Sequence, residues 1–81
     1  MPVSETQVLR LLAGRIKSLR ADKGWSQEQL AERAAMQRSY LANLERGRRD
    51  PSVRTLVKLS NALGVSIAEL LDSAKANRER R

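Results

Sequence analysis

The segment from Trp25 to Pro51, WSQEQLAERAAMQRSYLANLERGRRDP, restricts the possible folds of this chain more than any other segment. Ser26 is followed three residues later by Gln29, which is the capping-box pattern that begins a helix. Gln37 can cap a second helix, and Gly47 supplies the residue at which that helix can stop and turn. The segment therefore predicts two short helices joined by a tight turn, with polar and basic residues on the outer side of the second.

Similar start and stop signals divide the rest of the chain into helices, and no run alternates with period two as a strand would. We expect five helices, at about residues 5–23, 27–34, 38–46 and 53–63, with a fifth that begins after Ser66. The expected inner stripe of the first helix is Val8, Leu12, Ile16 and Leu19, and that of the fourth is Val53, Leu56, Val57, Ser60 and Leu63. These stripes predict an all-α bundle.

The chain has 81 residues, enough for one small domain over residues 1–81 with a single core over about residues 5–72. Residues 73–81, SAKANRERR, carry no apolar stripe. They are predicted to be a flexible basic tail. The alternative is a helix extension whose arginines contact DNA or a partner, namely Arg78, Arg80 and Arg81.

The composition excludes several classes of protein. The chain contains no cysteine and no histidine, so it lacks disulfides, thiolate metal sites, a thiol nucleophile and the commonest general base. No cluster of carboxylates has metal-ligand spacing, and we therefore expect no enzyme, no metal and no cofactor. The chain shows no signal peptide and no apolar run near the ~20 residues of a membrane span, so we expect a soluble cytoplasmic protein.

The charge of the chain favours a polyanionic partner. Sixteen lysines and arginines against nine acidic residues give a formal net charge of +7 at pH 7. This excess alone does not separate a nucleic acid from a membrane surface. Its placement is more informative, because four arginines surround the second helix of the segment: Arg38, Arg46, Arg48 and Arg49. RNA is poorly supported, since two aromatic residues make no platform for stacked bases.

The run from Gly14 to Leu71 resembles the phage-repressor/Cro-like (XRE-type) helix-turn-helix family, and QRSYLANLERG is similar to the reading helix of small restriction–modification controller proteins. The resemblance implies a compact five-helix bundle of the lambda-repressor type, in which the third helix enters the major groove of double-stranded DNA. It also implies homodimers on pseudo-palindromic sites, with half-sites ~34–36 Å apart. Ala35 departs from the family, which usually has glycine in the turn.

Five residues at or near the start of the third helix are candidates for base contacts. Arg38 suits guanine, with a phosphate as its alternative partner. Ser39 can bond a base or a phosphate, and Asn43 a base edge or the sugar-phosphate backbone. Gln37 can reach a base or cap the helix. Tyr40 can stack on a thymine methyl group or bond a phosphate; the alternative is partial burial against the second helix, with its hydroxyl at the surface.

The resemblance also assigns phosphate contacts. Gln27 opens the second helix, where its amide and backbone N–H groups can hold a phosphate together with Ser26. Three further candidates lie at the far end of the third helix, and some of them are alternatively plain surface charge: Arg46, Arg48 and Arg49. Trp25 is expected to pack rather than to stack on a ligand.

Two further groups of residues are expected to have structural roles. The family places an ion pair at Arg20 and Glu45, tying the first helix to the third. Dimerisation is expected at the last helix and the end of the fourth, because their apolar side chains exceed what one thin bundle can cover. These side chains, which could alternatively all face the core of the monomer, are Val65, Ile67, Leu70 and Leu71.

Together these features predict a sequence-specific transcriptional regulator that binds double-stranded DNA as a homodimer, without an evident small-molecule effector. The alternative is a protein-interaction subunit, antitoxin-like or coactivator-like, with weak DNA binding. Binding of a defined operator by the protein alone would separate the two.

Overall fold

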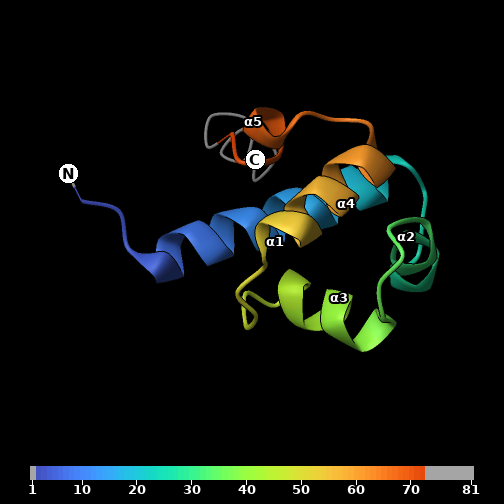
Figure 1. Cartoon of the computed structure of the whole chain (residues 1–81), viewed down its shortest axis with the longest axis horizontal. Coiled ribbons are helices and arrows are strands. Elements are labelled where there is room, and N and C mark those ends of the chain that lie inside the picture. The colour runs from blue at the N-terminus through green and yellow to red at the C-terminus, as the bar shows by residue number, and fades with distance from the viewer. Residues whose placement is uncertain (1, 73–81) are drawn as a thin grey trace.

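The computed structural model describes residues 2–72, and this part of the chain contains five α-helices and no strand (Figure 1). The all-α prediction is confirmed. In the four helices for which a start and an end were both predicted, each observed boundary lies within one residue of the expected one. The helices are α1 (Glu5–Asp22), α2 (Gln27–Arg33), α3 (Arg38–Glu45), α4 (Val53–Leu63) and α5 (Ile67–Leu70). The predicted tail, with its three candidate arginines, lies outside the described residues. No helix formed by residues 2–72 is both long and apolar enough to cross a membrane.

Serine side chains begin four of these helices. Ser4, Ser26, Ser52 and Ser66 each accept a hydrogen bond from the backbone N–H three residues later. The predicted cap at Gln37 is wrong, because this residue occupies the N-cap position of α3 but its side chain makes no capping bond. Glutamine is one methylene longer than the asparagine that this position favours, and its amide does not return to the helix end.

The core is aliphatic, as expected, and every helix contributes to it. Its buried members are Leu12, Ile16, Leu30, Ala31, Ala34, Leu41, Leu44, Leu59, Leu63 and Leu70. Trp25 is partly buried and packs against this cluster, as predicted for a packing residue.

The predicted stripe of α4 is wrong at two positions. Val53 and Val57 are 74% and 42% exposed, whereas Thr55 and Leu59 are buried. The face of α4 that packs on the core repeats every four residues through 55, 59 and 63. Val57 lies two residues from this line, about half a turn away, and therefore faces outward.

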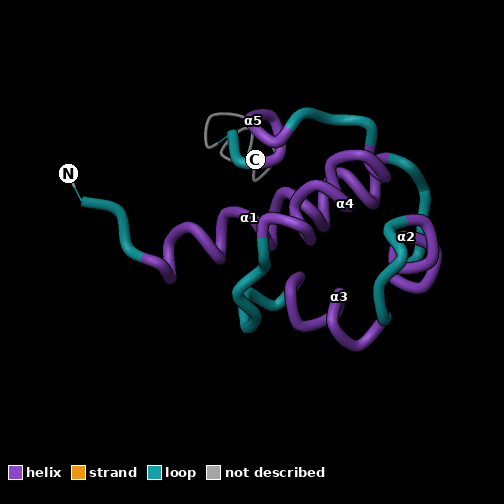
Figure 2. The backbone as a smooth tube through the Cα atoms, viewed as in Figure 1, coloured by secondary structure: helices purple, strands orange, loops and turns teal. Residues whose placement is uncertain are grey.

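Helix α1 organises the molecule, because it packs against α3, α4 and α5. Its first turns project beyond the bundle, and Val8 is 41% exposed there although it was expected in the inner stripe (Figure 1). Helices α2 and α3 pack against each other at the other side of the molecule, and Figure 2 shows the short loop that joins them. This helix-turn-helix leaves the outer side of α3 open.

Candidate nucleic-acid interface

One shallow hollow on the surface joins the start of α2 to the outer side of α3. Four of its six lining residues come from one face of α3, at positions 38, 39, 42 and 43, and residue 46 follows one turn later at the C-cap position. The lining residues are Gln27, Arg38, Ser39, Ala42, Asn43 and Arg46. Arg38, Ser39 and Arg46 are exposed, so this face is polar and basic and accessible from outside.

The opposite face of α3 anchors the helix in the bundle. Leu41 and Leu44 are buried in the core. Glu45 ends the helix, and its side chain is only 1% exposed. The orientation of the open face is therefore set by apolar packing along α3 and by the partners of one buried carboxylate.

Those partners satisfy both oxygens of the Glu45 carboxylate. Arg20 donates from Nε to Oε2 over 2.7 Å and from Nη2 to Oε1 over 2.9 Å, a bidentate pair. The third guanidinium nitrogen, Nη1, donates to the carbonyl oxygen of Trp25 over 2.8 Å, so Arg20 also holds the loop before α2. The hydrogen bond to Glu45 raises the pKa of Arg20 above its usual value, so the guanidinium group stays protonated.

Gln27 extends this network into the hollow. Its Nε2 donates to Glu45 Oε1 over 3.1 Å. One amide proton is thereby engaged, and the second proton and the carbonyl oxygen of the amide remain available to a ligand. The buried carboxylate thus fixes the position of a side chain at the start of α2 relative to α3.

The remaining residues predicted to contact bases do not line the hollow. Tyr40 is partly buried, and its hydroxyl lies 3.3 Å from Thr55 Oγ1, which lies 3.0 Å from Ser52 Oγ. Tyr40 therefore ties α3 to the start of α4 through its hydroxyl, which the burial alternative had placed at the surface. Gln37 is exposed at the N-cap position, just before the hollow.

The remaining predicted phosphate contacts surround the hollow without lining it. Ser26 is exposed, but its hydroxyl already caps α2 by accepting from Gln29 N over 3.1 Å. Arg48 and Arg49 are exposed in the loop after α3. The guanidinium of Arg49 lies over the ring of Tyr40, 5.3 Å from its centre.

The residues predicted for dimerisation are only partly available at the surface. Leu70 is fully buried in the core of its own chain. Val65, Ile67 and Leu71 are half-buried, so these three of the four predicted residues leave some apolar surface near α5.

Arg15, for which no role was predicted from the sequence, positions α5. Arg15 is 1% exposed and donates from Nε and Nη2 to the carbonyl oxygen of Glu69, over 3.2 and 2.7 Å. It lies three residues after Leu12 and four before Leu19, on the inner stripe of α1. A charged residue on an apolar stripe needs a partner inside the protein, and this signal could have identified it.

Known proteins share this arrangement. The helix-turn-helix family HTH_3 matches residues 16–70, which is more than half of the chain. The chain belongs to this family. An uncharacterised HTH-type transcriptional regulator, y4dJ of Sinorhizobium fredii, is 45% identical over 62 residues, which cover 76% of this chain and 80% of that protein. The immunity repressor of Bacillus phage phi105 is 44% identical over 57 residues, 70% of this chain but 40% of the repressor.

A solved structure agrees with the fold. The restriction-modification controller protein C.AhdI from Aeromonas hydrophila superposes with a TM-score of 0.74 at 40% identity, covering 76% of this chain and 94% of that chain. The predicted resemblance is thereby confirmed at the level of the family. The chain is a helix-turn-helix transcriptional regulator, and the relatives named here belong to a class of DNA-binding proteins.

Proposed function

We propose that this chain recognises a specific double-stranded DNA operator as a homodimer and reads it with the outer face of α3. One observation carries the proposal: the hollow brings Arg38, Ser39 and Asn43 together with Gln27 and Arg46 on one accessible face. These residue types can bond base edges and phosphates, and a single helix face is what a major groove admits.

The proposed roles follow from position within the hollow. Arg38, in the first turn of α3, pairs with the O6 and N7 atoms of a guanine. Ser39 is adjacent, and Asn43 follows one turn after it, so both reach neighbouring base edges. Gln27 and Arg46 stand at the borders of the hollow and hold the phosphates of the groove walls.

Residues around the hollow have secondary roles in this proposal. Ser26, Arg48 and Arg49 are exposed and contact the phosphate backbone, and Gln37 reaches a base edge beyond Arg38. The hydrogen bond of Tyr40 to α4 favours a packing role for this ring, which leaves only its edge for DNA.

The homodimer places two copies of α3 in successive major grooves, ~34–36 Å apart, so the operator is pseudo-palindromic. The similarity to C.AhdI over 94% of that chain supports a narrower proposal, that the chain is itself a restriction–modification controller. This narrower proposal requires the operator to lie upstream of restriction–modification genes in the genome that encodes the chain.

Selection of bound sequences from a random duplex pool tests the proposal. We expect one enriched half-site, repeated as an inverted repeat, and tighter binding of the selected duplex than of a scrambled duplex of equal composition. Affinity for both duplexes should fall with salt, because phosphate contacts release counterions. Equal affinity for the two duplexes would contradict the proposal and favour the protein-interaction subunit instead.

A further inference from the structure

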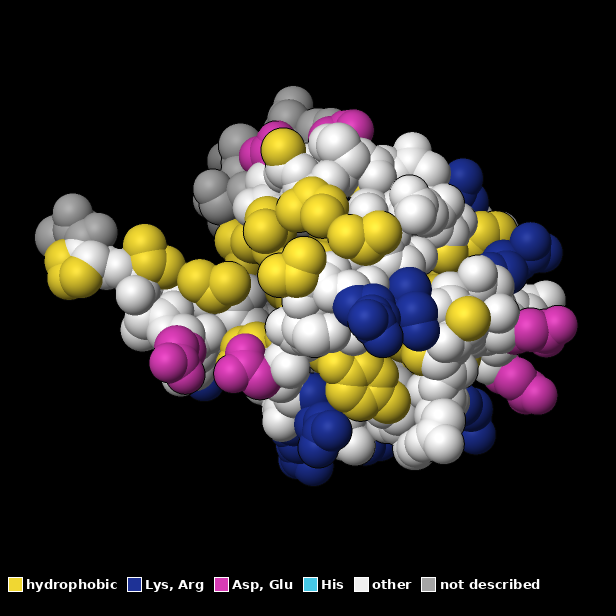
Figure 3. All heavy atoms as spheres, viewed as in Figure 1, with side chains coloured by type: hydrophobic (Ala, Val, Ile, Leu, Met, Phe, Trp, Pro, Cys, Tyr) yellow, Lys and Arg dark blue, Asp and Glu magenta, His cyan; other side chains and the backbone are white. Residues whose placement is uncertain are grey.

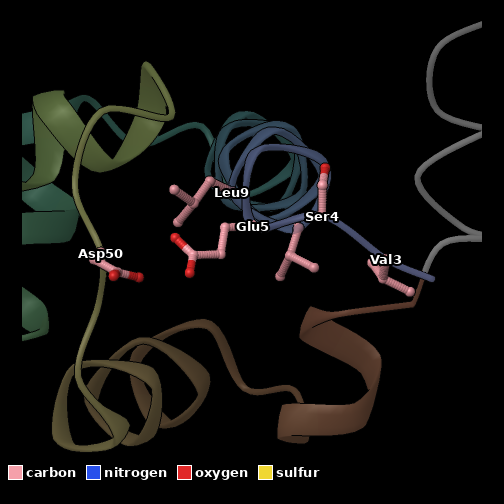
Figure 4. A pocket seen from close by; sticks show the side chains of 6 residues that line it. Val3, Ser4, Glu5, Leu9 and Asp50 are labelled. Atoms are coloured by element: carbon pink, nitrogen blue, oxygen red, sulfur yellow. The ribbon is translucent and has the colours of Figure 1, made fainter.

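The start of α1 carries an apolar ridge that no other part of the described chain covers. The ridge consists of Val3 and Val8, which are 72% and 41% exposed. It has a hollow on each side. The α5-side hollow lies toward the end of α5 and is lined by Val3, Gln7, Val8, Leu11 and Leu71. The loop-side hollow lies toward the loop before α4 and is lined by Val3, Ser4, Glu5, Val8, Leu9 and Asp50 (Figure 4).

The ridge is held in place although its helical turns project from the bundle. Ser4 Oγ accepts from Gln7 N over 3.1 Å, and Ser4 N donates to Gln7 Oε1 over 3.0 Å. Helical turns without tertiary packing are marginal in water, so this cap, which directly follows Val3, stabilises the first turns of α1, which carry Val8. The two neighbouring valines leave apolar surface that a protein contact would remove from water.

We propose that a second copy of this chain covers the ridge, with the ridge of each copy seated in the α5-side hollow of the other. The inference rests on the proposed homodimer and adds the surface that closes it. A contact of this kind is isologous, because the same patch serves both copies.

The area available at α5 supports this occupant. A stable interface buries about 800 Å² on each partner. Helix α5 is a single turn whose Leu70 is fully buried, so its apolar surface comes from the exposed Ala68 and from the half-buried Val65, Ile67 and Leu71. Leu71 also lines the α5-side hollow, so the apolar surface of α5 continues directly onto the ridge.

The charge beside the ridge excludes DNA as its occupant. Figure 4 shows the carboxylates of Glu5 and Asp50 pointing toward each other across the loop-side hollow. Two carboxylates repel a phosphate backbone. The start of α1 and α3 also lie in different parts of the molecule in Figure 1, so a copy seated on the ridge leaves α3 free for DNA.

Sedimentation equilibrium of the full chain carrying Val8→Gln tests the proposal. The dissociation constant of the dimer should rise about tenfold or more, because an isologous interface loses the apolar contact twice. Val57→Gln is the matched control: Val57 is 42% exposed in α4 and lines neither hollow. We expect it to change the dissociation constant less than twofold.

Three results would overturn the inference. The first is a wild-type dimer that Val8→Gln leaves unchanged, and the second is an equal loss with Val57→Gln. The third is a lower melting temperature with unchanged dimerisation, which would place another segment of the same chain in the hollow. In each of these three cases, a wild-type chain that prefers the selected operator would still support the proposed function. The proposed function itself would be contradicted if the wild-type chain showed no such preference.

Discussion

The outer face of α3 and the ridge at the start of α1 are both open to solvent, but they are built from different chemistry. The face of α3 is polar and basic, whereas the ridge is made of valine. Figure 3 shows hydrophobic side chains along the projecting start of α1, whereas lysine and arginine side chains lie in the middle of the visible face, at its lower edge and at its right side. The difference indicates two partners, a polyanion for the first surface and a protein for the second.

The two surfaces also have separate supports. Glu45 and Arg20 hold α3 from inside the bundle, where the carboxylate is almost fully buried. The ridge depends on the exposed capping box of Ser4 and Gln7. A change in one support should therefore leave the other surface intact, which lets mutations separate DNA reading from dimerisation.

Glu45→Ala is expected to have the largest effect. It leaves Arg20, whose side chain is 18% exposed, without its carboxylate and should lower the free energy of unfolding by about 3–5 kcal/mol. Urea denaturation measures this loss. Gln7→Ala, in the exposed cap below the ridge, should cost less than about 1 kcal/mol. If the two variants lost similar amounts of unfolding free energy, the buried ion pair would stabilise the protein no more than the exposed cap does, which would contradict this prediction.

Arg38→Ala should weaken binding of the selected operator by about 1–3 kcal/mol and relax the preference at one base pair in each half-site. The reason is that the side chain is exposed in the hollow and is proposed to pair with a guanine. Titration of the cognate duplex and of duplexes changed at single base pairs measures both effects.

Arg46→Ala is the matched control, because Arg46 lines the same hollow two turns later. It should weaken all sequences alike and reduce the slope of log affinity against log salt by about 1. Equal losses of Arg38→Ala on cognate and scrambled DNA would remove the base-reading role. Val8→Gln, on the ridge, should leave the salt slope per half-site unchanged.

The parts of the fold that could be predicted from the sequence are those fixed by local chemistry. Serine caps with a glutamine or glutamate three residues later marked the starts of α1, α2 and α5 correctly, since a capping box needs only four residues. The cap at Gln37 failed because a longer side chain has other conformations to adopt. The family resemblance supplied the partners Arg20 and Glu45, which lie 25 residues apart.

Features set by tertiary packing were predicted less well. Val57 was predicted to be an inner residue of an apolar helix, but the side of α4 that faces the core runs through residues 55, 59 and 63, which leaves Val57 facing outward. Val8 reads as core, and only the length of α1 relative to its neighbours exposes it. The position of Arg15 on the apolar stripe of α1 could have identified it as a residue with a partner inside the protein, but no side-chain pattern reveals the backbone carbonyl of Glu69 to which it donates. The ridge could therefore be found only in three dimensions.

Ala35→Gly should give the smallest effect, and it concerns the turn that sets the angle between α2 and α3. Ala35 has a φ of 52°, the left-handed conformation, and its side chain is exposed. Glycine removes the strain of the alanine Cβ atom, so the free energy of unfolding should rise by about 0.5–1 kcal/mol. Ala21→Gly, in an exposed right-handed helical position of α1, should lower it by about 0.5–1 kcal/mol.

Urea denaturation of both variants measures this difference in sign. The carbonyl oxygen of Ala35 accepts from Lys58 Nζ over 3.2 Å, a backbone contact that glycine retains. The turn should therefore keep its geometry, and operator affinity should change by less than twofold while the dimer constant stays as in the wild type. A loss of stability in Ala35→Gly would mean that the rigidity of alanine in this turn outweighs its strain, and that the reading face depends on a stiff turn as well as on Glu45.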